Sequence, residues 1–158
     1  MSRRTLQKLL VGNTILAALC SVPARAADDH EILLHGFRAP AIGPELRWGP
    51  VGVFVGAYPT VLSAEGVKSD TWWLKTGVTG YLGKFHLTGD RTSGFYGSVA
   101  YLRGFTEGWK SSALGLDAGF RWPIWSGLEA RLGVAVMKPA GRDWQVNPAG
   151  GISWAFSL

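Results

Sequence analysis

Charged side chains recur two or four residues apart in several short segments of this chain, as they would on one face of a β-strand. Acidic and basic residues on one face can bind or conduct something polar. They can also neutralise one another as ion pairs that only stabilise the fold. The surroundings of that face decide between the two. The group is Glu45, Arg47, Lys75, Asp117, Arg121, Glu129 and Arg131.

Two of the three histidines lie near the start of the chain. His30 and His35 are five residues apart, with Asp28, Asp29 and Glu31 close by. These residue types hold a metal ion only when they converge, and this cluster begins in an expected flexible tail. We therefore predict no metal site.

The third histidine, in His86-Leu87-Thr88, has a hydroxyl residue two positions away on the same face of a strand. Glu107 or Glu129 could supply the carboxylate that catalysis needs, yet nothing in the sequence places either one near His86. Phosphate-binding glycine loops, zinc motifs and serine-hydrolase elbows do not occur in the sequence. We therefore assign no catalytic residue and no cofactor.

Residues 1–26 have the order of a secretory signal peptide. Arg3, Arg4 and Lys8 precede a mostly apolar run, and small residues at Ala24-Arg25-Ala26 suit a signal peptidase. We expect cleavage after Ala26 and one mature domain at 27–158. The first residues also resemble a twin-arginine signal, whose pathway exports folded proteins, so the export route stays open.

The formal net charge of +5 comes mostly from this leader. Arg3, Arg4, Lys8 and Arg25 lie within it, so the mature chain is nearly neutral. A basic stripe suited to nucleic acid is therefore not expected. The single cysteine, Cys20, is also in the leader, which leaves no thiol for a disulfide, a zinc site or a nucleophile.

Period-two alternation is clearest over 112–122, 128–137 and 146–158, where large apolar residues face Gly, Ala, Ser or charged residues. Large apolar residues suit lipid, and small residues with a few charges suit the lumen of a narrow barrel. Arg or Lys facing the middle of a bilayer costs about 2–4 kcal/mol, so the charged face is predicted to point inward. If Arg121 opposes Glu129 across this hairpin, then Asp117 lies diagonal to Arg131.

Five earlier runs, at 31–37, 42–48, 51–58, 71–83 and 94–105, bring the expected strands to eight. A spanning strand needs about 9–11 residues, and eight of them with connections fill 27–158. The predicted fold class is all-β: an up-and-down antiparallel transmembrane barrel of about eight strands. Residues 59–70 and 138–145 are predicted to be its longer exposed segments.

Most tryptophans lie at or near predicted strand ends, where aromatic belts meet the two membrane interfaces. These are Trp48, Trp72, Trp73, Trp109, Trp122, Trp125 and Trp144.

The chain ends in Ile152, Trp154, Phe156 and Leu158, which alternate up to the last residue. This resembles the terminal strand that outer-membrane barrels present to their assembly machinery, although those usually end in Phe or Trp. By this pattern the mature chain is similar to small eight-stranded bacterial outer-membrane barrels. That class includes structural barrels, adhesion-related barrels and lipid A-modifying enzymes.

The resemblance implies an outer-membrane location, with membrane lipid, lipopolysaccharide and the barrel-assembly machinery as partners. In that class, the lipid A 3-O-deacylases use a His and a Ser two residues apart and a Glu. His86-Leu87-Thr88 has Thr in place of Ser and lacks the flanking Ser-Asn-Ala sequence. We therefore expect a barrel without enzymatic activity, with a structural or surface-contact role.

The interior of such a barrel is expected to be an ion-paired plug, because eight strands leave room for side chains and little else. Two alternatives stay open. One is a lipid A-modifying enzyme, and the other is a soluble periplasmic barrel that binds a lipophilic ligand.

Overall fold

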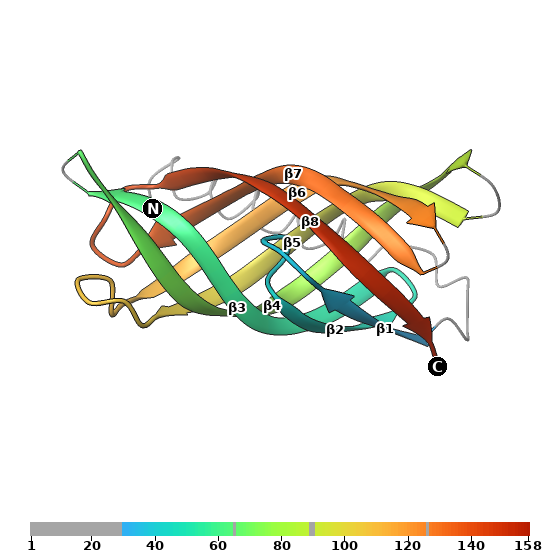
Figure 1. Cartoon of the computed structure of the whole chain (residues 1–158), viewed down its shortest axis with the longest axis horizontal. Coiled ribbons are helices and arrows are strands. Elements are labelled where there is room, and N and C mark those ends of the chain that lie inside the picture. Colours follow the sequence, from blue (N-terminus) through green and yellow to red (C-terminus); the bar gives the residue numbers. More distant parts are fainter. Residues whose placement is uncertain (1–29, 65, 89–90, 126) are drawn as a thin grey trace, which may run out of the picture.

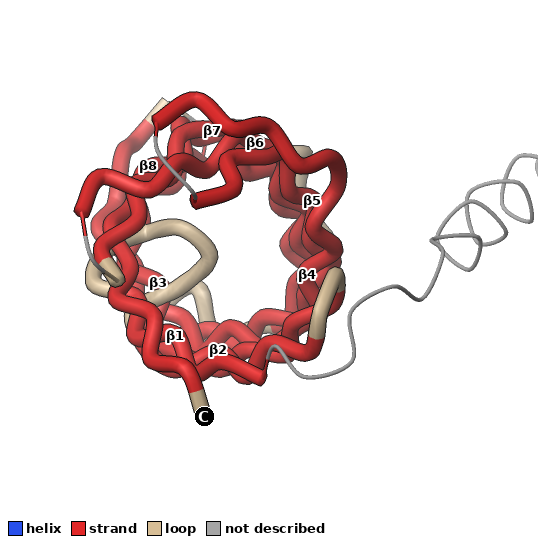
Figure 2. The backbone as a smooth tube through the Cα atoms, turned by 90° about the vertical axis from the view of Figure 1, so that its right-hand side faces the viewer, coloured by secondary structure: helices blue, strands red, loops and turns tan. Residues whose placement is uncertain are grey.

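The computed structural model describes residues 30–64, 66–88, 91–125 and 127–158. Eight antiparallel strands follow one another around a closed barrel, and the last pairs with the first (Figures 1 and 2). The predicted all-β, up-and-down antiparallel barrel is thereby confirmed. The strands are β1 (His30–His35), β2 (Gly43–Trp48), β3 (Val51–Ala64), β4 (Val67–Thr88), β5 (Arg91–Gly104), β6 (Ser112–Trp125), β7 (Leu128–Pro139) and β8 (Gln145–Ser157).

The two ends of the barrel differ in their connections. The start of β1 and the end of β8 lie at one end, the termini end, together with the turns after β2, β4 and β6. The connections after β3, β5 and β7 lie at the opposite end, the loop end. The predicted signal peptide and its cleavage site fall outside the described residues. Within the described ranges, no helix is long and apolar enough to cross a membrane.

The prediction of a long exposed loop over 59–70 is wrong. β3 pairs with β4 without interruption from Val51 opposite Gly80 to Ala64 opposite Val67. Ser63 and Lys68, which lie in the predicted segment, belong to strands that continue with the same alternation. The hairpin turns only at its tip, where Gly66 has a φ of 81°.

Side chains are sorted between the two faces of the wall with a period of two residues. In β6, Leu114 and Leu116 are exposed, whereas Ala113 and Asp117 are buried. The same sorting occurs around the ring, because each of the eight strands carries exposed large apolar side chains. The outer surface of the barrel is therefore apolar and its lumen holds the small, aromatic and charged residues.

Two of the predicted belt residues lie inside the barrel. Trp73 and Trp109 are buried, and their rings meet edge to face with centroids 6.5 Å apart. Trp73 alternates in phase with Lys75, so it shares the inward face of β4. Both rings belong to an apolar cluster that fills the lumen toward the loop end, with Phe54, Tyr58, Leu62, Leu102 and Met137 among its members.

The connection between β1 and β2, residues 36–42, turns into the barrel. Figure 2 shows it as a loop inside the ring of strands, and Ala39, Pro40 and Ala41 in it are almost fully buried. Ala39 packs against Ala135 of β7 and Ala149 of β8. Small residues at those positions give the inward loop its space.

A substitution at Gly151 of β8 tests this packing, because a Cβ there would lie 2.9 Å from the carbonyl oxygen of Ala39. We expect Gly151→Val to lower the free energy of unfolding by about 1–3 kcal/mol by forcing the loop away. Denaturant unfolding followed by tryptophan fluorescence measures this. Gly150→Val is the matched control, because a Cβ there would lie 3.9 Å from its nearest neighbour, the carbonyl oxygen of Arg131. Equal losses in the two variants would contradict the packing.

Candidate functional site

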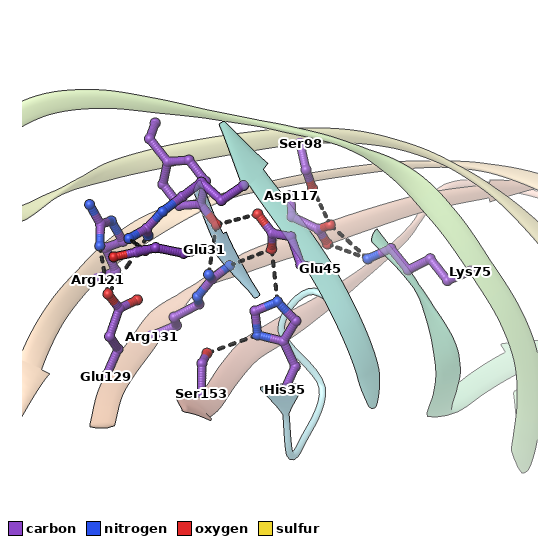
Figure 3. Close-up of polar contacts among 12 residues, drawn as sticks. Glu31, His35, Glu45, Lys75, Ser98, Asp117, Arg121, Glu129, Arg131 and Ser153 are labelled. Atoms are coloured by element: carbon purple, nitrogen blue, oxygen red, sulfur yellow. Dashed lines mark hydrogen bonds and ion pairs between the residues drawn. The ribbon is translucent and has the colours of Figure 1, made fainter. Parts of the chain in front are cut away.

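The charged residues singled out in the sequence all point into the lumen, and none is more than 9% exposed. They come from four strands, and Figure 3 shows most of them converging in the lumen. They are Glu45 and Arg47 of β2, Lys75 of β4, Asp117 and Arg121 of β6, and Glu129 and Arg131 of β7.

Tyr81 of β4 lies at the centre of the network toward the termini end. Its hydroxyl donates a hydrogen bond to Glu45 Oε1 at 2.5 Å and accepts one from Arg131 Nη2 at 2.7 Å. The guanidinium carbons of Arg47, Arg121 and Arg131 lie 5.1, 4.9 and 5.4 Å from the centre of its ring. One buried aromatic ring thus separates three like charges and offers each a favourable cation–π contact.

Glu129 joins two of these arginines. Its Oε1 lies 2.8 Å from Arg121 Nη1 and 3.7 Å from Arg47 Nη1. Arg47 also pairs with Glu31 of β1, and Arg131 Nη1 lies 3.6 Å from Glu45 Oε2. Each guanidinium in this layer therefore has a carboxylate partner, as buried charges require.

The pairing considered for β6 and β7, with Arg121 opposite Glu129, does not occur. Arg121 lies opposite Arg131, and Asp117 lies opposite Ala135, although Arg121 still reaches Glu129 diagonally. β6 continues to Trp125 and β7 begins at Leu128, and a register shift between Pro123 and Trp125 sets the pairing of the residues beyond it. Tyr81 then lies against the two opposed arginines.

The ion pair between Lys75 and Asp117 lies apart from this network. Lys75 Nζ donates to both oxygens of Asp117, at 2.9 and 2.6 Å, and Asp117 also accepts from the Ser98 hydroxyl at 2.6 Å. The ammonium lies 4.5 Å from the centre of the Tyr58 ring, where the apolar cluster begins. The pair thus forms the boundary between the charged and apolar parts of the lumen.

The histidines have different environments. His30 is exposed, and the side chain of His86 lies outside the part of the chain that the structure describes. His35 is buried, with Nε2 2.7 Å from Glu45 Oε2 and Nδ1 2.8 Å from the Ser153 hydroxyl. Both ring nitrogens therefore have protein partners, and the described residues contain no cluster of ligands able to hold a metal ion.

The Ser153, His35 and Glu45 side chains form a chain of hydrogen bonds like the one that activates a serine nucleophile. If the His35 ring is neutral and donates a hydrogen bond from Nε2 to the Glu45 carboxylate, its Nδ1 accepts a hydrogen bond from the Ser153 hydroxyl. All three side chains are nearly inaccessible, however, and Glu45 is also bonded to Tyr81. In this conformation the chain links β1, β2 and β8 rather than presenting a nucleophile to a substrate.

Sequence reasoning missed four members of the network: Glu31, His35, Tyr81 and Ser153. Tyr81 and Ser153 alternate in phase with residues already expected to point inward, so their orientation was readable from the sequence. Their partners were not, because they come from strands far away in the chain. His35 was considered only as a metal ligand, and it points inward because it alternates in phase with Leu33.

Comparisons with protein-family models, with curated protein sequences and with solved structures give no match. The lumen and the outer surface are therefore the basis for assigning a function. In the described lumen, four basic side chains face four acidic ones, Glu31 included. This balance suits an interior that holds its own charges.

Tyr81→Phe removes the hydroxyl that joins Arg131 to Glu45. We expect this change to lower the free energy of unfolding by about 1–3 kcal/mol, because a buried donor and acceptor lose their partner. Tyr101→Phe is the matched control, because Tyr101 is exposed on the outer face. Urea titration of both variants measures the difference. A Tyr81→Phe protein as stable as the control would show that the hydroxyl contributes little.

Proposed function

We propose that this protein is an integral outer-membrane β-barrel with a closed lumen, whose role is structural or depends on contacts made by its loop end. The observation that carries the proposal is the apolar outer surface, to which every strand contributes. Water-soluble monomers rarely expose an apolar patch larger than a few hundred Å². In a bilayer the same surface is favourable, and a closed barrel satisfies the backbone groups that lipid cannot.

The distribution of exposed aromatic side chains supports this placement. Trp48, Trp125 and Trp154 lie toward the termini end, and Trp72 and Trp144 lie toward the loop end. Amphipathic rings favour the two interfaces of a membrane, and the Val and Leu residues between them favour hydrocarbon. The outward residues of β8, including Ile152 and Phe156, also fit a terminal strand recognised by the barrel-assembly machinery.

The lumen supports a barrel that does not conduct. A ring of eight strands is just wide enough for side chains to fill. Here the inward loop, the apolar cluster and the ion-paired network occupy successive parts of it. Lipid and lipopolysaccharide around the barrel are then its expected partners, and export by the leader its expected route.

The two alternatives have less support. A soluble ligand-binding barrel would carry its apolar residues inside and polar ones outside, which is the reverse of the surface described above. A lipid A-modifying enzyme would need an accessible nucleophile. The Ser153–His35–Glu45 chain has suitable hydrogen bonds, but its serine is 1% exposed.

Cell fractionation tests the placement directly. We expect the full-length protein, expressed in a Gram-negative host, to stay with the outer membrane after washing with salt and carbonate. Its gel mobility should change on boiling, because a folded barrel resists the detergent until heated. Recovery as a soluble, monodisperse periplasmic protein without detergent would overturn the proposal.

An arginine substituted on the outer face tests whether that face lies in the hydrocarbon of a membrane. Val99 is half-exposed near the middle of β5, and Val146 is exposed at the start of β8. We expect Val99→Arg to lower the stability of the barrel in phospholipid vesicles by about 2–4 kcal/mol, and Val146→Arg by about 0–1 kcal/mol. Urea titration in vesicles measures both. Small and equal effects would indicate that neither residue faces hydrocarbon.

A further inference from the structure

Four basic side chains lie at the loop end of the barrel, on the side formed by β5, β6 and β7, and are here named the basic rim. Arg103 is exposed on the outer face of β5, and Lys138 is half-buried on the outer face of β7. Lys110 and Arg142 belong to the connections that follow β5 and β7. The rim thus combines two strand positions with two loop positions at one end of the barrel.

The charges of the basic rim are not neutralised by the protein. None of its four members forms an ion pair with a carboxylate among the residues that the structure describes, whereas each of the four cations in the lumen does. Glu107 and Asp143 lie in the same two connections, where both are exposed and neither forms an ion pair within the described ranges. Four cations therefore lie near two carboxylates, which leaves an excess of positive charge for an external anion.

Two members of the rim are held in place by aromatic rings and backbone carbonyls. Lys138 Nζ donates to the Arg142 carbonyl at 2.6 Å and lies 5.8 Å from the centre of the Trp144 ring. The guanidinium carbon of Arg142 lies 4.1 Å from the centre of the Trp109 ring, and its Nη2 donates to the Gly108 carbonyl at 2.9 Å. These contacts position both cations without neutralising them, because rings and carbonyls carry no net charge.

Exposed aromatic side chains indicate the depth at which the rim meets a membrane. Tyr101 and Phe105 lie two residues before and after Arg103, Trp144 lies beside Lys138, and all three rings are more than half exposed. Aromatic rings are enriched at the membrane interface, where the lipid phosphates also lie. The connections after β5 and β7 are longer than the turns at the termini end, and in outer-membrane barrels the longer connections face the outside of the cell. The rim is then level with the headgroups of the outer leaflet.

The spacing of the rim suits a headgroup with two phosphates. Lys138 lies opposite Leu114 of β6, which lies opposite Tyr101, two residues before Arg103. Because neighbouring strands are about 4.8 Å apart, β5 and β7 are separated by roughly 10 Å across the sheet. A disaccharide phosphorylated at both ends reaches both positions, whereas a glycerophospholipid has a single phosphate to offer.

We propose that the basic rim binds the two phosphates of the glycolipid lipid A in the outer leaflet, with Arg103 at one phosphate and Lys138 at the other. Lys and Arg form charge-assisted hydrogen bonds with phosphate oxygens. The inference rests on the membrane placement proposed above. It deepens that placement by naming the headgroup contacts and the end of the barrel that faces outward.

Native mass spectrometry of the purified full-length protein in a neutral detergent tests the proposal. Bisphosphorylated lipid A and the same lipid freed of both phosphates are added at equal concentrations. We expect the bisphosphorylated form to bind about tenfold more tightly or better, because two cations contribute. Equal binding of the two lipids, or binding of neither by a protein that still needs detergent, would overturn the rim and leave the membrane placement intact. Binding of neither by a protein that is monodisperse without detergent would overturn both.

Single substitutions test the two cations that contact phosphate. We expect Arg103→Gln and Lys138→Gln each to weaken the binding of bisphosphorylated lipid A about fivefold and to leave that of the phosphate-free lipid unchanged. Lys138→Arg keeps the charge and should bind as the unmodified protein does. The matched control is Lys68→Gln, because Lys68 is exposed on β4 four residues from Trp72 toward the hairpin tip, roughly 13 Å beyond the aromatic level. Equal losses in the control and the two test variants would overturn the specific contacts.

Phosphatidylglycerol tests the requirement for two phosphates. We expect this lipid to bind more weakly than bisphosphorylated lipid A, because its one phosphate meets only one of the two cationic positions. Equal binding of the two lipids would overturn the assignment to a headgroup with two phosphates. Gel mobility before and after boiling verifies that each variant has folded, so that a loss of binding reports on the rim.

Discussion

The pairing of β8 with β1 is the interaction on which the rest of the structure depends. It joins Glu31 through His35 to Ser157 through Ser153 and closes the sheet into a ring. Once the ring is closed, every second side chain must point into a narrow lumen and the others must point outward. An open sheet would leave two edges and would have no interior in which to bury charge.

Charge neutralisation inside the ring follows from that closure. Removing a guanidinium or carboxylate from water carries a penalty that only close partners offset, so each buried charge needs an opposite charge within reach. Tyr81 meets part of this demand without any charge of its own, because its ring separates three guanidinium groups and its hydroxyl joins a cation to an anion. The resulting network connects strands from both halves of the chain and holds the termini end of the barrel together.

The short first hairpin shapes the other half of the molecule. Because β1 and β2 end early, the chain between them turns into the lumen and packs on Gly151, Ala135 and Ala149 rather than extending the wall. That arrangement leaves 58–64 of β3 paired only with β4, and 145–151 of β8 paired only with β7. Pro59 and Pro148 have no N–H, so these edges carry fewer unpaired backbone donors. The small residues along β8 and the two prolines thus have one common structural cause.

The sequence by itself determined the all-β class, the number of strands and which side chains share a face, because a period of two residues is a local property of a strand. It also selected the interior charges, since Asp117, Arg121, Glu129 and Arg131 alternate with large apolar residues. It could not assign their partners. A bulge near Pro123 changes the register of β6 against β7, and Tyr81 of β4 meets Glu45 of β2 over the strand that lies between them. Trp73 and Trp109 were placed in outer belts because composition cannot distinguish an interfacial ring from a buried one. Only the closed ring, which brings distant strands within a few ångströms of one another, decided the contacts in the lumen and the place where the wall is incomplete.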